Sequence, residues 1–169
     1  MQPLTLIVNE NDEIIWLWTR EEIDTKNAWY RVSALRITNS KGEILLAQRA
    51  WTKSHNPGKR GAAVAGTNDE GETYLSNIIK ETKEEIGIDI NEDDIRVGEK
   101  SVRKGKHNHF TQRFYLTIDK PIEEFTIPEN DVIGLRWISK EQLMFEITHA
   151  PETIIASTEP DTRKIFWLI

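Results

Sequence analysis

Residues 71–88 read G71-E-T-Y-L-S-N-I-I-K-E-T-K-E-E-I-G-I88, a short segment that gathers several glutamates and then reaches a glycine. Residues recurring at i, i+3, i+4 and i+7 spacing make one apolar face: Leu75, Ile78, Ile79, Thr82 and Ile86. This pattern predicts a helix from about Thr73 to Ile86. Gly87 is a natural end for it, because glycine adopts left-handed backbone without strain.

The glutamates of this helix, Glu81, Glu84 and Glu85, fall within about 100° of one another, since each residue turns a helix by about 100°. They lie on the face opposite Leu75, Ile79 and Ile86. Like charges one turn apart repel each other, and Lys80 relieves only its neighbour Glu84 at i,i+4. A solvated surface helix is one interpretation. A site for Mg²⁺ is the other, because hard cations take oxygen ligands. Glu72 lies at the helix start, where the dipole favours a carboxylate that can cap.

Charge along the chain alternates in blocks around this helix. Residues 44–68 and 100–118 contain no acid and several lysines and arginines, whereas residues 66–94 hold ten carboxylates. Such a layout suits a polyanion that is held by cations while a metal lies between carboxylates and phosphates. Ordinary solvated charge is the alternative interpretation.

Length and composition set the class of protein. The 169 residues suit one domain spanning residues 1–169. The chain contains no cysteine, which excludes disulfides, Cys-based zinc sites and thiol nucleophiles, and fits a reducing cytosol. No apolar run approaches the roughly 20 residues of a membrane helix, and no signal peptide is indicated. The net charge of −6 argues against binding a nucleic-acid polymer. We therefore expect a cytoplasmic protein without a membrane partner.

Strand-like segments lie on both sides of the predicted helix. A turn at residues 39–42 joins two of them into a hairpin. We expect strands at residues 13–19, 31–38, 43–49, 95–103 and 110–118 and around Trp137. Ser139 caps a further helix through about Phe145, and a last helical stretch follows Pro151. The mixture predicts an α/β or α+β sandwich.

The stretch from Gly66 to Ile88 resembles the signature of the Nudix family, Gly-x5-Glu-x7-Arg-Glu-U-x-Glu-Glu-x-Gly-U, with U an aliphatic residue. The fixed positions matched in register are Gly66, Glu72, Glu81, Glu84, Glu85, Gly87 and Ile88. Lys80 stands where the family has arginine, and Thr82 where it has an aliphatic residue. Lysine keeps the charge but lacks the bidentate fork with which arginine orients a carboxylate. The resemblance implies a Nudix-like α/β/α sandwich with a mixed central sheet.

Further matches over about residues 9–145 resemble the branch related to isopentenyl diphosphate isomerase. They include Arg31, Asn39-Ser40-x-Gly42, Arg49, Lys53 and Pro57-Gly58. The isomerase of that branch has a catalytic cysteine immediately before the glycine matching Gly66 and a metal-binding histidine just after it. Here Ala65 and Thr67 occupy these places, so the resemblance implies hydrolase chemistry, with the isomerase reading disfavoured.

By this resemblance the chain is a Nudix-type diphosphohydrolase that cleaves a nucleoside diphosphate-linked compound by water attack on phosphorus. The residues implied for the site of Mg²⁺, with Mn²⁺ as a substitute, are Glu81, Glu84, Glu85 and Gly66. Glu84 or Glu85 would also orient the water, while Lys80 and Glu72 fix the carboxylates. The general base comes either from these glutamates or from a downstream acid, for which Glu129 and Asp131 are candidates. The family also implies a possible homodimer.

Cations and one aromatic residue upstream of the signature are the candidates for binding a small-molecule phosphoanhydride substrate: Arg49, Lys53, Lys59, Arg60 and Trp51. Arg49 is favoured because it precedes the signature on a predicted strand. Trp51 follows it in a loop and could stack on a base, whereas Trp16, Trp18 and Trp137 lie in strand-like segments and are expected in the core or at its edge.

His107 and His109 share a polar loop and are interpreted as surface residues rather than metal ligands.

Other functions stay open beside the hydrolase. A Nudix-fold module that senses a nucleotide or diphosphate without turning it over is the alternative, which Lys80 favours and the complete glutamate set disfavours. A scaffold domain has little support because the sequence has no repeats and no amphipathic segment without a partner. The identity of the substrate stays open.

Overall fold

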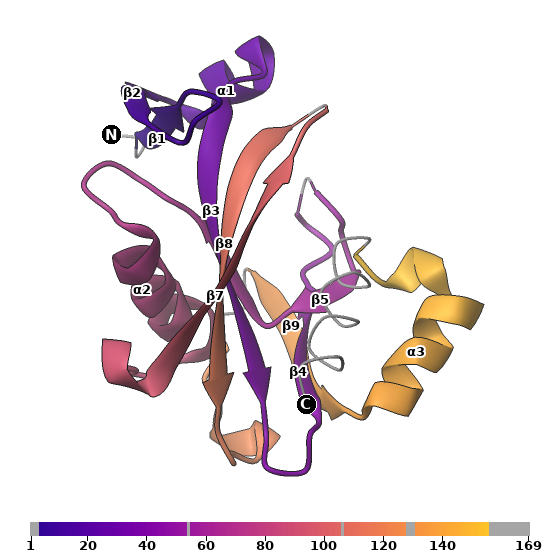
Figure 1. Cartoon of the computed structure of the whole chain (residues 1–169). Coiled ribbons are helices and arrows are strands. Elements are labelled where there is room, and N and C mark those ends of the chain that lie inside the picture. Colours follow the sequence, from indigo (N-terminus) through magenta and orange to yellow (C-terminus); the bar gives the residue numbers. More distant parts are fainter. Residues whose placement is uncertain (1–3, 54, 106, 128–130, 156–169) are drawn as a thin grey trace.

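The computed structural model describes residues 4–53, 55–105, 107–127 and 131–155. Within these residues, nine strands form one mixed sheet, and α2 and α3 lie on opposite sides of it (Figure 1). The elements are β1 (Thr5–Val8), β2 (Ile14–Trp18), α1 (Arg20–Lys26), β3 (Trp29–Thr38), β4 (Ile44–Arg49), β5 (Arg60–Ala62), β6 (Val64–Thr67), α2 (Tyr74–Ile86), β7 (Ile95–Arg103), β8 (Asn108–Thr117), β9 (Val132–Ile138) and α3 (Lys140–His149). The predicted α/β/α sandwich with a mixed sheet is confirmed.

Strand β3 organises the sheet. It pairs in parallel with β8 along its whole length, from Trp29 opposite Asn108 to Thr38 opposite Thr117. Its other edge is shared by β1, β6 and β4, all antiparallel to it. This arrangement places the middle of β3 directly beside β6, which carries Gly66.

Two apolar cores cover the two faces of the sheet, and β4 contributes to both because successive side chains of a strand point to opposite faces. Leu45 and Ala47 belong to the core that includes Ile78 and Ile86 of α2. Ile44 and Leu46 belong to the smaller core that includes Leu143 of α3. A strand buried on both faces shows a continuous apolar run, as residues 44–47 do.

Helix α2 begins and ends close to the predicted residues. Thr73 is the N-cap, and its hydroxyl oxygen accepts a hydrogen bond of 3.0 Å from the Ser76 N–H. Gly87 ends the helix with a φ of 70°. The prediction that Glu72 can cap the helix is wrong, because Thr73 supplies the cap. Thr82 is fully buried, and its hydroxyl donates to the Ile78 carbonyl at 2.6 Å.

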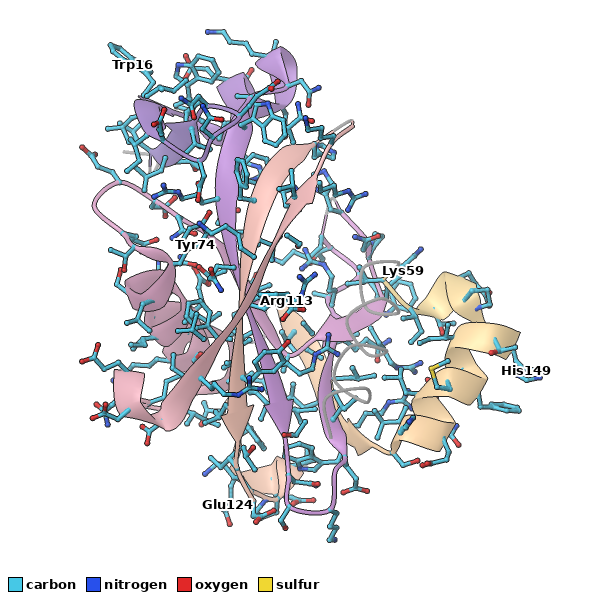
Figure 2. The ribbon with its side chains drawn as sticks, in the orientation of Figure 1. Trp16, Lys59, Tyr74, Arg113, Glu124 and His149 are labelled. Atoms are coloured by element: carbon cyan, nitrogen blue, oxygen red, sulfur yellow. The ribbon has the colours of Figure 1, made fainter. Side chains whose placement is uncertain are left out.

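Several elements differ from the sequence-based prediction. β1, α1, β5 and β6 were not predicted, and the helical stretch after Pro151 is a single 3₁₀ turn, Pro151–Thr153. Trp16 was expected in the core or at its edge but is 66% exposed and points away from the molecule (Figure 2), because β2 ends the sheet and pairs only with β1 among the described strands. Trp18 and Trp137 are half-buried, as expected.

The turn between β1 and β2 is tied to the rest of the fold through Asp12, which has a φ of 64°. Its carboxylate accepts hydrogen bonds from Arg31 at 2.7 Å, Tyr74 at 3.1 Å and Lys100 at 2.5 Å. These partners belong to β3, α2 and β7. One carboxylate therefore fixes the N-terminal hairpin against the first turn of α2.

No helix in the described part of the chain is long and apolar enough to cross a membrane.

Candidate active site

The side chain of Glu81 lies across the backbone of Gly66. A β-carbon at Gly66 would lie only 2.4 Å from the Cδ of Glu81, a separation that real atoms do not adopt. Gly66 pairs with Ser33 of β3 in the sheet, so its position cannot shift without disturbing the ladder. The structure thus gives Gly66 a steric role: it makes room for a carboxylate on α2 to reach over β6.

A network of short contacts holds Glu81 and Glu72 together. The Lys80 ammonium lies 2.6 Å from Glu72 Oε1, 3.6 Å from Glu81 Oε1 and 3.9 Å from Asp69 Oδ2. Glu72 Oε2 accepts from the Asp69 N–H and from Asn77 Nδ2, each at 2.8 Å. Asn77 Nδ2 also lies 3.4 Å from Glu81 Oε1. The predicted grouping of Lys80 and Glu72 behind a signature glutamate is present in space.

These contacts shift the pKa values in opposite directions. Burial alone would raise the pKa of Glu72, but the Lys80 ammonium and the N–H donors of Asp69 and Asn77 outweigh burial and hold that pKa below its usual value. Burial raises the pKa of Glu81, and Lys80 only partly opposes it. The pKa of Lys80 is raised, because its acidic neighbours outweigh the opposing effect of burial. Glu72 is therefore the firmly ionised partner of Lys80, and Glu81 carries less compensated charge.

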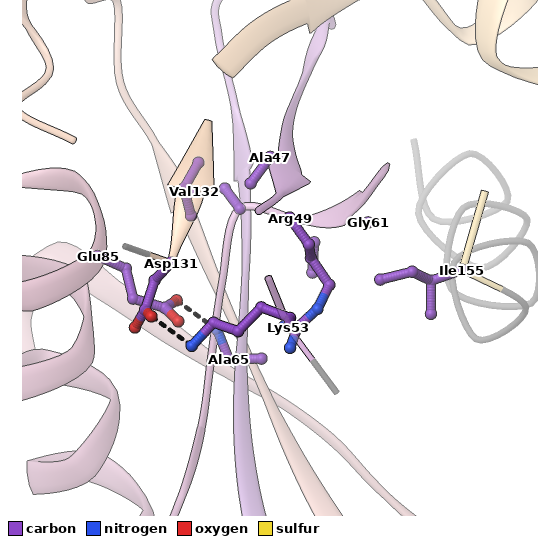
Figure 3. Close-up of a pocket in the computed structure, with 11 residues that line it drawn as sticks. Ala47, Arg49, Lys53, Gly61, Ala65, Glu85, Asp131, Val132 and Ile155 are labelled. Carbon is purple, nitrogen blue, oxygen red and sulfur yellow. Dashed lines mark hydrogen bonds and ion pairs between the residues drawn. The ribbon is translucent and has the colours of Figure 1, made fainter. Parts of the chain in front are cut away.

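Glu85 is the most perturbed carboxylate of the helix. Its Oε2 accepts a hydrogen bond of 3.1 Å from the backbone N–H of Ala65 on β6 (Figure 3). Burial raises the pKa of Glu85 to about 8, the charges of Glu81 and Asp131 add to this rise, and the Ala65 N–H and Arg49 oppose it. A buried carboxylate beside other carboxylates gains strongly from a nearby cation.

A cavity of about 190 Å³ opens beside Glu85. Arg49, Lys53 and Asp131 also line it, so two cations and two acids face one space (Figure 3). Arg49 ends β4, and its Nε donates to the His55 carbonyl at 3.0 Å. Lys53 forms an ion pair with Asp131. The structure thus brings two of the predicted substrate-binding cations into the same cavity as a signature glutamate.

Other predicted substrate-binding residues do not line this cavity. Trp51 is 71% exposed, and its ring lies against Gly58. Arg60 is directed to Glu146 of α3, with a separation of 3.8 Å, and Lys59 is half-buried at the end of the loop that leads to β5. Their roles in substrate binding stay predictions, and the structure does not favour them.

The remaining candidates lie apart from the cavity or outside the described residues. Glu129 falls outside the described residues. His107 and His109 were expected at the surface, but both are half-buried. His107 lies 3.8 Å from Asp24, and His109 packs on Tyr30 with ring centroids 5.3 Å apart. Their neighbours Asp24 and Tyr30 belong to α1 and to the start of β3, and neither histidine lines the cavity beside Glu85.

The donor set fits a divalent cation. In the described part of the chain, no three carboxylate or imidazole groups converge into a complete metal-binding cluster, and Glu84 is exposed on the helix. Glu81 and Glu85, however, interact across one helical turn, and the pKa of each is raised. Mg²⁺ is commonly held by one or two carboxylates together with waters and substrate phosphates, and Mn²⁺ accepts the same oxygen donors. Glu85 lines the cavity that Arg49 and Lys53 also line, and Glu81 lies one helical turn before it, so the two carboxylates are compatible with that mode of binding.

Asn77, Asp69 and the Ala65 N–H were not predicted as parts of the site. Asn77 could have been recognised from its spacing, since it lies four residues before Glu81 and therefore on the same side of the helix. Ala65 contributes only its backbone N–H to Glu85, and Asp69 donates its backbone N–H to Glu72 besides placing its carboxylate near Lys80. Because every non-proline residue carries a backbone N–H, side-chain types do not predict these two hydrogen bonds.

Comparisons with known proteins identify the family of the chain and relatives of its fold. The family model of the NUDIX domain matches residues 28–157. An uncharacterized Nudix hydrolase of Yersinia pestis is 30% identical over 82 residues, which are 48% of this chain and 45% of that protein, so the matched segment spans less than half of this relative. A Nudix hydrolase of Deinococcus radiodurans is 28% identical over 145 residues, covering 83% of this chain and 81% of the relative. A crystal structure of a Deinococcus radiodurans protein superposes with a TM-score of 0.78 at 24% identity, covering 95% and 98% of the two chains.

Proposed function

The chain belongs to the Nudix family of hydrolases, and on that premise we propose that it uses Mg²⁺ to cleave the phosphoanhydride bond of a nucleoside diphosphate-linked or related diphosphate compound. One observation carries the proposal: Glu85 shares a cavity with Arg49 and Lys53. Cations opposite a metal-binding carboxylate are the arrangement that a diphosphate needs, because its oxygens must be neutralised from both sides.

Each group has a distinct task in the proposed reaction. Arg49 and Lys53 bind the phosphate oxygens that face β4. Glu81, Glu84 and Glu85 would hold Mg²⁺, which when bound neutralises phosphate charge and acidifies its water ligand. Lys80 and Glu72 fix the glutamates from behind. Water forms the new bond to phosphorus as the bridging P–O bond breaks.

The proton of the attacking water goes to a carboxylate near the cavity. Glu84 and Glu85 are the bases within the signature. Asp131 is the alternative, because it lines the same cavity beside Glu85 and pairs with Lys53 (Figure 3). In this scheme Lys53 releases Asp131 when it engages the phosphate, which ties substrate binding to the freeing of a base.

The proposed substrate is a small molecule rather than a nucleic-acid polymer, in keeping with the net charge of −6. A cytoplasmic location is part of the proposal and rests on the absence of cysteine from the sequence. We also propose a homodimer. Its support is the edge strand β2, where Ile14, Ile15 and Trp16 are exposed, since an unpaired apolar strand edge favours association with a second copy.

Hydrolysis of a panel of nucleoside diphosphate and triphosphate derivatives, with and without Mg²⁺ and with the phosphorylated products separated and identified, tests the proposal. We expect turnover only with the metal, and a loss of roughly 10²-fold or more in kcat for Glu85→Gln or Glu84→Gln. Glu92→Gln is the matched control, because Glu92 is an exposed acid in the turn after α2. Metal-independent turnover that survives both substitutions would contradict the proposal.

Binding of these compounds without turnover would instead indicate the sensor module. Isomerase chemistry has less support, because residue 65 is an alanine on β6 that donates its backbone N–H to Glu85 and the chain has no cysteine. Incubation with isopentenyl diphosphate would detect isomerase activity.

A further inference from the structure

The side chain of Asn77 is polar but fully buried on α2. Its Nδ2 faces three oxygens: Glu72 Oε2 at 2.8 Å, the Thr67 carbonyl at 3.2 Å and Glu81 Oε1 at 3.4 Å. All three are acceptors, so only the NH₂ end of the amide can face them. Its Oδ1 is buried without a hydrogen-bond partner among the described residues. Burying a hydrogen-bond acceptor without a partner costs free energy. The orientation of the Asn77 amide therefore indicates that its N–H groups have a specific role.

Lys80 contacts the same two carboxylates from the next turn of the helix. Its ammonium lies 2.6 Å from Glu72 Oε1 and 3.6 Å from Glu81 Oε1. Glu72 therefore has Lys80 on one oxygen and Asn77 on the other, and both donors also approach the same oxygen of Glu81. A single arginine guanidinium holds a carboxylate in this two-pronged way.

We infer that Asn77 is a positioning residue that, together with Lys80, replaces the arginine of the family signature. The ammonium binds one oxygen of Glu72, the amide binds the other, and the pair fixes Glu81 over Gly66. The inference rests on the proposed function in one respect, namely that Glu81 binds the metal. It explains how the chain keeps an ordered Glu81 although lysine lacks the fork of arginine.

The inference predicts that an arginine at residue 80 makes Asn77 dispensable for positioning Glu81. Asn77→Leu keeps the branched shape of the side chain and removes both donors. The double variant Asn77→Leu/Lys80→Arg returns two parallel donors from one residue. Thr82→Val is the matched control, since Thr82 is equally buried on the same helix but its hydroxyl bonds only to the Ile78 carbonyl among the described residues.

Two measurements on the purified protein test whether Asn77 and Lys80 position Glu81, and neither requires a turnover assay. Crystal structures of the metal-free variants locate Glu81, and calorimetric titration with Mn²⁺ gives the metal affinity. For Asn77→Leu we expect Glu81 to leave its place over Gly66 and the Kd for Mn²⁺ to rise by roughly 10- to 100-fold. The double variant should return both to the wild-type values, and Thr82→Val should change neither. If Asn77→Leu does not fold, Asn77→Ala takes its place in the same comparison.

The outcomes separate this inference from the proposed function. The inference is overturned if the wild type binds Mn²⁺ and Asn77→Leu changes neither the position of Glu81 nor the Kd for Mn²⁺. The proposed hydrolase function is unaffected by that result. A loss in Asn77→Leu that Lys80→Arg does not repair also overturns it. If the wild type binds no Mn²⁺, the proposed function fails, and the crystal structures alone then judge whether Asn77 and Lys80 hold Glu81 jointly.

Discussion

The carboxylate of Glu81 and the backbone of Gly66 are in such close contact that a β-carbon at residue 66 would lie 2.4 Å from Glu81 Cδ. Glycine at this point of the signature is therefore required by the neighbouring carboxylate, since the three atoms nearest to that β-carbon all belong to Glu81. The contact joins the helix that bears the charge to the strand beneath it.

Gly66→Ala should move Glu81 while leaving the fold in place. We expect kcat to fall by roughly 10²-fold, because displacement of a reacting group by about 1 Å has that effect. The free energy of unfolding should change by less than about 2 kcal/mol, since a flexible side chain can turn away. Steady-state kinetics and urea unfolding measure the two effects. Gly134→Ala is the control, because nothing lies within 4 Å of a β-carbon built there; equal losses in both variants would contradict the prediction.

Arg49→Met and Lys53→Met should weaken substrate binding. Each removes a charge-assisted contact worth about 1.5–3 kcal/mol, so we expect kcat/KM to fall by roughly 10- to 100-fold, mainly through KM. Arg60→Met offers a comparison of the same residue type, because Arg60 faces Glu146 rather than the cavity. Its KM should match the wild type. A large rise in KM for Arg60→Met alone would reverse the assignment.

Asp12→Asn should destabilise the N-terminal hairpin. Asparagine tolerates the positive φ of this residue but leaves Arg31 and Lys100 without their shared anion. We expect the free energy of unfolding to fall by about 2–4 kcal/mol, measured by urea denaturation. Glu10→Gln, an exposed acid in the same turn, should have almost no effect. Equal stability of Asp12→Asn and the wild type would show that the network is dispensable.

Stability should fall in acid because of His109. Burial, reinforced by the positive charges of Arg103, His107 and Arg20, lowers the pKa of His109 from 6.5 to about 4. Between these values the unfolded chain binds more protons than the folded one, so the free energy of unfolding decreases as pH falls from about 6.5 towards about 4. The decrease is fully developed below the folded-state pKa and absent above pH 6.5.

His109→Phe keeps a ring against Tyr30 and removes the titrating group. Urea unfolding at pH 7.5 and 5 should therefore show a smaller acid loss for this variant, by on the order of 1–2 kcal/mol. His149→Gln, at the exposed end of α3, should retain the wild-type loss. An unchanged pH dependence in His109→Phe would place the acid sensitivity elsewhere.

Local sequence was sufficient for elements whose cause is local. The spacing of Leu75, Ile78, Ile79 and Ile86 with Gly87 predicted α2. The turn at residues 39–42 predicted the β3–β4 hairpin, in which the Asn39 side chain accepts from the N–H groups of Lys41 and Glu43. The capping box of α1 at Thr19 and Glu22 was also visible in the sequence and was overlooked.

Residues whose environment is set by distant segments could not be predicted in the same way. Arg49 and Arg60 are both basic and close in sequence, yet only Arg49 lines the cavity, because Glu146 on α3 attracts Arg60. Trp16 resembles a core residue, but β2 ends the sheet, and no property of residues 14–18 reveals that. Asn77 contacts Glu81 through an orientation that the Thr67 carbonyl on β6 helps to fix.

The parallel ladder between β3 and β8 joins residues 79 positions apart, and α2 lies within the loop that this ladder closes. Loop-closure entropy must be overcome before such long-range pairs form, which slows folding. During synthesis, a nascent chain that ends before Asn108 would contain the whole glutamate signature but lack the strand that pairs with β3 throughout its length. We therefore expect metal affinity to appear late and abruptly as the chain emerges, with the arrival of β8.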